Sequence, residues 1–153
     1  MSIQFGKPIR GHILMALNQA QQASLQSREF VHAHDREGWL GLFAEDGVIQ
    51  DPIGPSYLDE SGLGHSTQAQ REVFYDNNMA NTDIKITIHQ SYGVANECAN
   101  HVTLNMKYDL DGKKYSQEVN GVFTYAVNEE GKLTALRGFW EIEESMKTIK
   151  PVE

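Results

Sequence analysis

The sequence has only one cysteine, Cys98, so no disulfide bond can form within the chain. This fits a reducing compartment, because disulfides are typical of secreted proteins. Positive charge is also scarce: 13 lysines and arginines stand against 21 aspartates and glutamates, for a formal net charge of −8. Such a chain lacks the basic surface that binds nucleic-acid phosphates or anionic lipids. We therefore expect no nucleic-acid partner and no membrane partner.

Long hydrophobic runs are missing as well. No apolar segment approaches the roughly 18 residues of a membrane span, and no apolar run follows the first residues as in a signal peptide. No phosphate-binding loop, dinucleotide glycine motif or nucleophile elbow is found. His32 and His34 are two apart, so on a helix their rings point about 200° apart and do not meet at one metal. We expect a cytoplasmic protein with no metal and no cofactor.

The chain is long enough for one domain with its own core. Its first half has the spacing and caps of helices. One long helix is predicted over residues 12–34, which contain no glycine or proline. A short helix follows the cap Asp35, and a third runs from the cap Ser66 or Thr67 to about residue 78.

The second half alternates apolar and polar residues, which predicts strands over 84–89, 102–108, 115–127 and 133–142. Asp111 and Gly112 form a strong hairpin signal between two of them, and residues 128–131 form a second turn. Helices followed by an antiparallel meander define an α+β class. Residues 1–11 are expected to be an N-terminal tail, 12–145 the domain and 146–153 a C-terminal tail.

One acidic residue stands out at the end of a predicted helix, turn and brief strand. The turn falls at Asp46-Gly47, and Asp51 then precedes Pro52, which restricts it to an extended conformation. Val48, Ile49 and Ile53 are apolar neighbours. Asp51 is therefore either a general base held at a fixed place or a residue that only caps a turn, and both interpretations stay open.

Several segments resemble the ketosteroid isomerase family, within the wider group of folds shared with nuclear transport factor 2 and the SnoaL-type polyketide cyclases. The resemblance covers roughly residues 25–145. It is carried by residues 38–46, by Asp51 to Gly54, by the helix ending in Phe74-Tyr75, by the hairpin at Asp111-Gly112, and by the strand ending in Gly138-Phe139-Trp140. It implies a cone-shaped fold, in which a curved antiparallel sheet wraps around a long N-terminal helix.

The resemblance also implies roles for single residues. The family's general base falls on Asp51, its pocket-wall tryptophan on Trp140, and the tyrosine that supports its oxyanion tyrosine on Tyr75. The oxyanion tyrosine itself falls near Ser27, and the protonated aspartate near Gly121 or Phe123. Both oxyanion donors are therefore unmatched.

Removing the α-proton of a ketone needs donors for the enolate oxygen, and each donor is often worth about 3–4 kcal/mol. Tyr75 is the first candidate for a replacement, with His101 and Tyr57 as further ones. His89 and His101 fall on the polar faces of their strands and are expected at the surface, whereas His65 lies in a glycine-rich loop and could reach a ligand. Turnover of steroid enones is expected to be weak or absent.

Two functions follow. The chain is an isomerase- or cyclase-like enzyme doing acid–base chemistry on a small apolar carbonyl compound, with Asp51 as the base and Tyr75 as a second catalytic group, or it is a non-catalytic ligand-binding or dimerisation module of the same fold. The substrate-binding residues are predicted to be Trp140, Phe123, Leu136, Met106, Ser27, Tyr57 and His65. A homodimer is expected through the outer sheet face, whose alternating positions include Asn105, Lys107, Glu118, Asn120 and Thr124.

Overall fold

The computed structural model describes residues 16–153, so the expected tail over 1–11 and the expected helix start at His12 lie outside the described residues. The first helix, α1, spans Gln19–His32. It begins there because Asn18 caps it. The Asn18 side chain accepts a hydrogen bond of 2.8 Å from the Gln21 N–H, and the Gln21 side chain accepts one of 3.1 Å from the Asn18 N–H. The helix is thus shorter than the prediction over 12–34.

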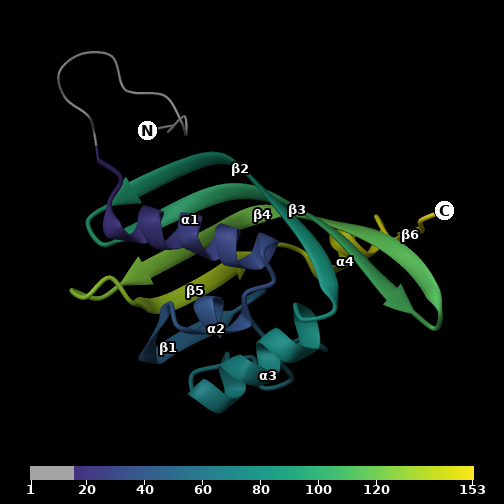
Figure 1. Cartoon of the computed structure of the whole chain (residues 1–153), viewed down its shortest axis with the longest axis horizontal. Coiled ribbons are helices and arrows are strands. Elements are labelled where there is room, and N and C mark those ends of the chain that lie inside the picture. The colour runs from purple at the N-terminus through teal and green to yellow at the C-terminus, as the bar shows by residue number, and fades with distance from the viewer. Residues whose placement is uncertain (1–15) are drawn as a thin grey trace.

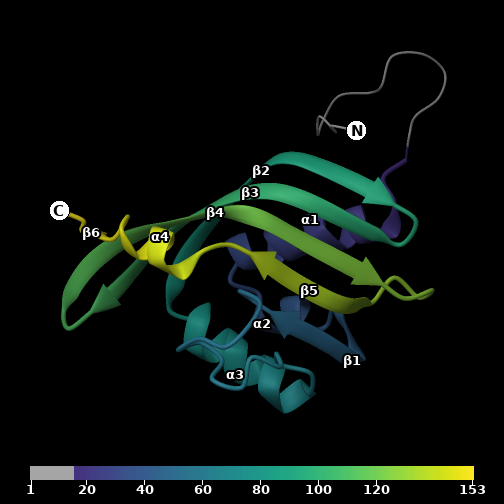
Figure 2. The ribbon, with the colours of Figure 1, turned by 180° about the vertical axis from the view of Figure 1, so that it is seen from behind.

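Five long or medium strands form a curved sheet. They are β1 (Phe43–Gln50), β2 (Thr82–Val94), β3 (Glu97–Leu110), β4 (Lys113–Val127) and β5 (Leu133–Phe139). Their order in space is β1-β5-β4-β3-β2. The four strands β2 to β5 are antiparallel in sequence order, as predicted, whereas β1 runs parallel to β5 and extends the sheet beyond the expected meander. Figures 1 and 2 show the sheet curving around α1.

The β3–β4 hairpin turns at the predicted place. Asp111 and Gly112 both have positive φ, at 52° and 78°, as a two-residue hairpin turn requires. The β2–β3 connection is a second hairpin, with Ala95 at φ 53°. The two hairpins pair β2, β3 and β4, which have 13, 14 and 15 residues, into one continuous wall.

The segment before Asp51 differs from its prediction. No helix end or simple turn is found at Asp46-Gly47. Instead β1 begins at Phe43, and its pairing with β5 shifts register between Phe43 and Val48. The buried guanidinium of Arg71 donates hydrogen bonds to the Gly47 carbonyl at 2.7 Å and the Glu45 carbonyl at 3.3 Å. Arg71 therefore stabilises the irregular part of β1. Asp51 directly follows the end of this strand.

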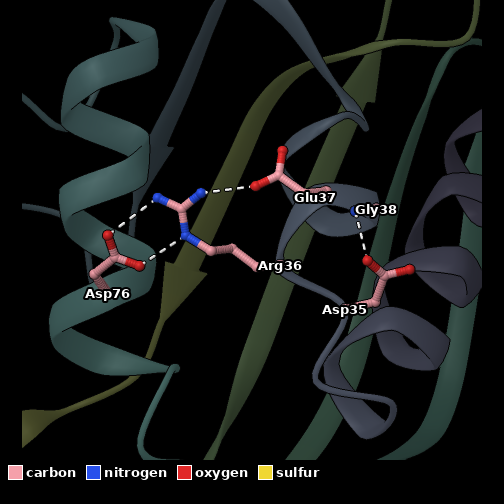
Figure 3. A network of polar contacts seen from close by, with 5 residues as sticks. All are labelled: Asp35, Arg36, Glu37, Gly38 and Asp76. Atoms are coloured by element: carbon pink, nitrogen blue, oxygen red, sulfur yellow. Dashed lines mark hydrogen bonds and ion pairs between the residues drawn. The ribbon is translucent and has the colours of Figure 1, made fainter.

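Two further helices close one end of the sheet. The short α2 (Arg36–Leu40) is capped by Asp35, as predicted, whose Oδ1 accepts from the Gly38 N–H at 2.9 Å. Thr67 caps α3 (Gln68–Asn78). Figure 3 shows how the two helices are joined: the Arg36 guanidinium donates to both carboxylate oxygens of Asp76 on α3, at 2.9 and 3.1 Å.

The C-terminal residues form part of the domain. Residues 146–153 were expected to be a tail, but the helix α4 (Ile142–Met146) and the strand β6 (Lys150–Pro151) pack onto β4. The Ser145 hydroxyl donates to the Glu118 carbonyl at 2.7 Å, and Tyr115 and Ser116 pair with β6. This segment occupies the edge of β4 beyond the end of β5, because β5 pairs with β4 only from Val122 onward.

The core lies between the sheet and the helices. Trp39 is at its centre, with rings of Phe43, Phe74 and Tyr75 within 6.3 Å between centroids. Among residues 16–153, none of the helices combines the length and apolar character that a membrane crossing needs.

Candidate functional site

A cavity of about 520 Å³ opens between the sheet, α1 and α3. Its size is typical of small-molecule sites. Most of its wall is apolar, and comes from alternate residues on the inner face of the sheet. The lining apolar side chains include Ile84, Ile86, Val102, Leu104, Met106, Val119, Phe123 and Leu136.

The carboxylate of Asp51 lies in this cavity. Trp140 Nε1 donates a hydrogen bond of 2.6 Å to Asp51 Oδ1. Burial raises the pKa of Asp51 from 3.8 to about 6, because the charged form loses its hydration, while the Trp140 hydrogen bond opposes part of that rise. An ionised carboxylate with such a pKa is suited to accept a proton near neutral pH.

The backbone of β5 makes room for this carboxylate. The Ile53 N–H donates to the Gly138 carbonyl at 3.1 Å, which ties the loop after Asp51 to β5. A Cβ atom on Gly138 would lie 2.6 Å from Asp51 Oδ1 and 3.0 Å from the Phe123 ring. Glycine is therefore required at 138 for Asp51 to take its place.

Three buried polar side chains, from three different elements, share the cavity wall with Asp51. They are Ser27 of α1, Trp39 of α2 and Tyr125 of β4. Trp39 Nε1 donates to Ser27 Oγ at 3.0 Å. Burial raises the pKa of Tyr125, the charge of Asp51 adds to this rise, and the Ser27 hydroxyl opposes it. Tyr125 was not predicted from the sequence, although it lies two residues beyond Phe123 and so faces the same side of its strand.

Most of the predicted ligand-binding residues line the cavity. Trp140, Phe123, Leu136, Met106, Ser27 and Tyr57 all belong to its wall, together with Asp51. Trp140 and Phe123, both predicted to bind the substrate, therefore face the same interior. Tyr57 is 68% exposed, so it lies at the rim rather than in the interior.

Two predicted site residues lie elsewhere. Tyr75 is buried behind Trp39, with ring centroids 5.6 Å apart, and its charged neighbours are Arg36, Asp35 and Asp76. His65 packs on Phe74, with centroids 5.2 Å apart, and its backbone pairs with Ile49. Neither residue lines the cavity, because the helix and loop that carry them turn these side chains away from it.

His89 and His101 are exposed on the outer face of the sheet, with ring centroids 4.9 Å apart. His89 Nε2 lies 2.8 Å from the Thr103 hydroxyl, which donates to Asn120 Oδ1 at 2.6 Å. Asn120 thus faces away from the cavity, as the alternation predicted. His101 is on the wrong face of β3 to serve as a donor in the cavity.

A curved sheet over α1 that encloses an apolar cavity with one buried carboxylate defines a protein of the nuclear transport factor 2-like fold. The family model described as SnoaL-like domain matches residues 26–136. The chain therefore belongs to the SnoaL-like family, and its solved structural neighbours include ketosteroid isomerase-like proteins.

Three solved structures illustrate this. A Delta 5-3-ketosteroid isomerase from Mycobacterium sp. is 32% identical, with 89% of this chain and 100% of that chain covered and a TM-score of 0.77. RV0760c from Mycobacterium tuberculosis, in complex with estradiol-17beta-hemisuccinate, is 35% identical over 88% of this chain and 99% of that one, with a TM-score of 0.78. A putative SnoaL-like polyketide cyclase from Shewanella denitrificans shares the fold at 13% identity, with coverages of 84% and 93% and a TM-score of 0.69. None of the curated protein sequences compared with the chain matches it.

Proposed function

We propose that this protein catalyses proton transfer on a small apolar carbonyl compound, with Asp51 as the general base. One observation carries the proposal: a buried carboxylate, whose pKa is raised to about 6, faces an apolar cavity of about 520 Å³. Proton abstraction next to a carbonyl needs a base of this kind at a fixed place. The 32% identity to a ketosteroid isomerase supports the same class of reaction.

The chemistry fits the arrangement of the two Asp51 oxygens. Oδ1 is held by the indole of Trp140, which leaves Oδ2 to take the proton. The C–H electrons then form the carbon–carbon double bond of an enolate, and the electrons of the carbonyl bond move to its oxygen. Asp51 returns the proton to the same carbon, which gives exchange, or to a conjugated carbon, which gives isomerisation.

The test is hydrogen–deuterium exchange at the α-carbon of a rigid β,γ-unsaturated ketone in D₂O, followed by NMR. We expect exchange with the wild-type protein and loss of at least 10²-fold with Asp51→Asn, which keeps the shape and removes the base. Ligand binding by the variant, measured by quenching of tryptophan fluorescence, should persist. Equal exchange rates for both proteins would contradict the role of Asp51.

A second candidate function is binding of a small apolar ligand without catalysis. Phe123 favours it, because an apolar ring stands near the place where the family has an acid, and RV0760c was solved with an estradiol derivative. In that case the wild-type protein binds the ketone, and no α-proton exchanges above the rate in buffer. The same experiment separates the two functions.

We also propose that the protein is a homodimer through the outer face of the sheet. Val122 and Phe139 are paired neighbours on β4 and β5, 39% and 48% exposed, and the Arg137 guanidinium lies 5.5 Å from the Phe139 ring centre. An aromatic and an arginine amid polar residues is the usual composition of an interface centre. Sedimentation at micromolar concentration should give a dimer, and Val122→Glu should give a monomer. A monomeric wild type would contradict the proposal.

A further inference from the structure

Ser27 links the polar side chains of the cavity wall. The indole N–H of Trp39 is a donor only, so at 3.0 Å the Ser27 oxygen has to accept from it. Ser27 and Tyr125 both line the cavity, and the Ser27 hydroxyl lowers the pKa of Tyr125 against the effect of burial. Ser27 is therefore held by Trp39 and in turn influences Tyr125.

The hydroxyl of Tyr125 has a proton available for a ligand. A tyrosine hydroxyl can donate one hydrogen bond, and among residues 16–153 no group accepts one from Tyr125. Tyr125 is part of the cavity wall, and in the same residues the one enclosed polar side-chain atom without a partner is Asn100 Oδ1. The Tyr125 hydroxyl can therefore donate into the cavity. The acceptor that suits it is a carbonyl or enolate oxygen.

The sheet register places this donor beside the proposed base. Phe123 pairs with Gly138, against which the Asp51 carboxylate lies, and Tyr125 pairs with Leu136, two residues further along each strand. Two residues along a strand span about 7 Å, with both side chains on the same face. One ketone in the cavity can therefore reach Asp51 with its α-hydrogen and Tyr125 with its oxygen.

We propose that Tyr125 is the hydrogen-bond donor that holds the substrate's carbonyl oxygen, and that Ser27 and Trp39 are positioning residues that orient it. This inference rests on the proposed function of Asp51. Tyr125 keeps its proton throughout and stabilises the negative charge that develops on the oxygen as Asp51 takes the α-proton. The donor comes from β4 and not from Tyr75, which lies outside the cavity. A single donor of this kind is consistent with turnover that is measurable but slow.

The test compares Tyr125→Phe with Tyr92→Phe. Tyr92 is the control because it lies outside the cavity and its exposed hydroxyl donates to Gln90 Oε1 at 3.0 Å. We expect Tyr125→Phe to lower kcat for α-proton exchange by about 10²–10³-fold with little change in KM, since the interaction strengthens as charge develops. Tyr92→Phe should leave kcat unchanged. Equal effects of the two variants would overturn the proposal.

A second measurement does not depend on catalysis. Substituted naphthols imitate an enolate, since their oxygen carries negative charge on a flat apolar ring, and absorbance reports the ionised form. In the Asp51→Asn background, we expect 2-naphthol to bind at least tenfold more weakly after Tyr125→Phe and with unchanged affinity after Tyr92→Phe. If the wild-type protein catalyses no exchange but naphthol affinity falls in Tyr125→Phe, the proposed proton transfer is wrong and the role of Tyr125 as a donor is supported. If exchange requires Asp51 but naphthol affinity is unchanged in Tyr125→Phe, the role of Asp51 is supported and that of Tyr125 is wrong.

The positioning residues have their own readout. Ser27→Ala removes the hydroxyl that orients Tyr125 and leaves the phenol in place. We expect a smaller loss of naphthol affinity than for Tyr125→Phe, and no additional loss when the two changes are combined, because they act through one group. Additive losses would contradict a positioning role for Ser27. This variant also tests the proposal should Tyr125→Phe fail to fold.

Discussion

Trp140 Nε1 and Asp51 Oδ1 are joined by a hydrogen bond of 2.6 Å inside the cavity. The bond stabilises the ionised carboxylate, whereas burial favours the neutral acid, and burial is the larger effect. Trp140, at the end of β5, thus adjusts the pKa of Asp51, which lies at the end of β1.

The rate of proton transfer should rise with pH and level off above a midpoint near the Asp51 pKa of about 6, because only the ionised carboxylate accepts a proton. Trp140→Phe removes the hydrogen bond that lowers this pKa, so the midpoint of kcat/KM should move to higher pH. The measurement is a pH–rate profile of both proteins from pH 4 to 9. A midpoint that stays in place or moves down would show that the indole does not tune the base.

Asp51→Asn should increase stability at alkaline pH. Below pH 3.8, Asp51 is neutral in both the folded and the unfolded protein, so it does not affect the free energy of unfolding. As the pH rises from 3.8 through about 6, ionisation of Asp51 favours the unfolded chain, and the fold loses stability. The full shift of the pKa corresponds to about 3 kcal/mol. We expect urea unfolding to give equal free energies for wild type and variant at pH 4, and a more stable variant at pH 8. A variant that is less stable at both pH values would make Asp51 a structural cap.

Gly138→Ala should impair activity without unfolding the protein. The added methyl group would lie 2.6 Å from Asp51 Oδ1 and must displace the carboxylate or the strand. We expect kcat for α-proton exchange to fall at least tenfold, since small displacements of a base are costly. Gly41→Ala, which adds a methyl group at the end of α2, is the control and should leave kcat unchanged. Full activity of Gly138→Ala would mean that Asp51 is not held against β5.

Arg71→Leu should destabilise the fold by about 2–4 kcal/mol, because it leaves the Gly47 and Glu45 carbonyls without the guanidinium that now satisfies them. Arg36→Leu is a matched control that removes an exposed ion pair with Asp76, and its effect should be much smaller. The free energy of unfolding in urea is the measurement. Similar losses for both variants would show that Arg71 is not important to the irregular part of β1.

Much of the fold could be predicted from local sequence. Asp35 and Thr67 are helix caps, and Asp111-Gly112 is a hairpin turn, because side-chain hydrogen bonds and backbone conformation at these positions are decided within four residues. The alternation along β4 predicted that Phe123 faces inward and Asn120 outward, because strand side chains have a period of two. The elements missed were those whose partners are distant. β1 requires pairing with β5, and the C-terminal segment requires the free edge of β4.

Local sequence is enough to predict a carboxylate before a proline at the end of a strand, a net negative charge, and a sheet with one apolar face. Which polar groups meet that carboxylate depends on the tertiary structure. Trp140 reaches Asp51 across 89 positions of sequence, Trp39 reaches Ser27 from another helix, and Tyr125 joins them from β4, while Tyr75 turns away. The physical reason is that hydrogen bonds between distant segments depend on sheet register and helix packing, which short-range sequence patterns do not encode.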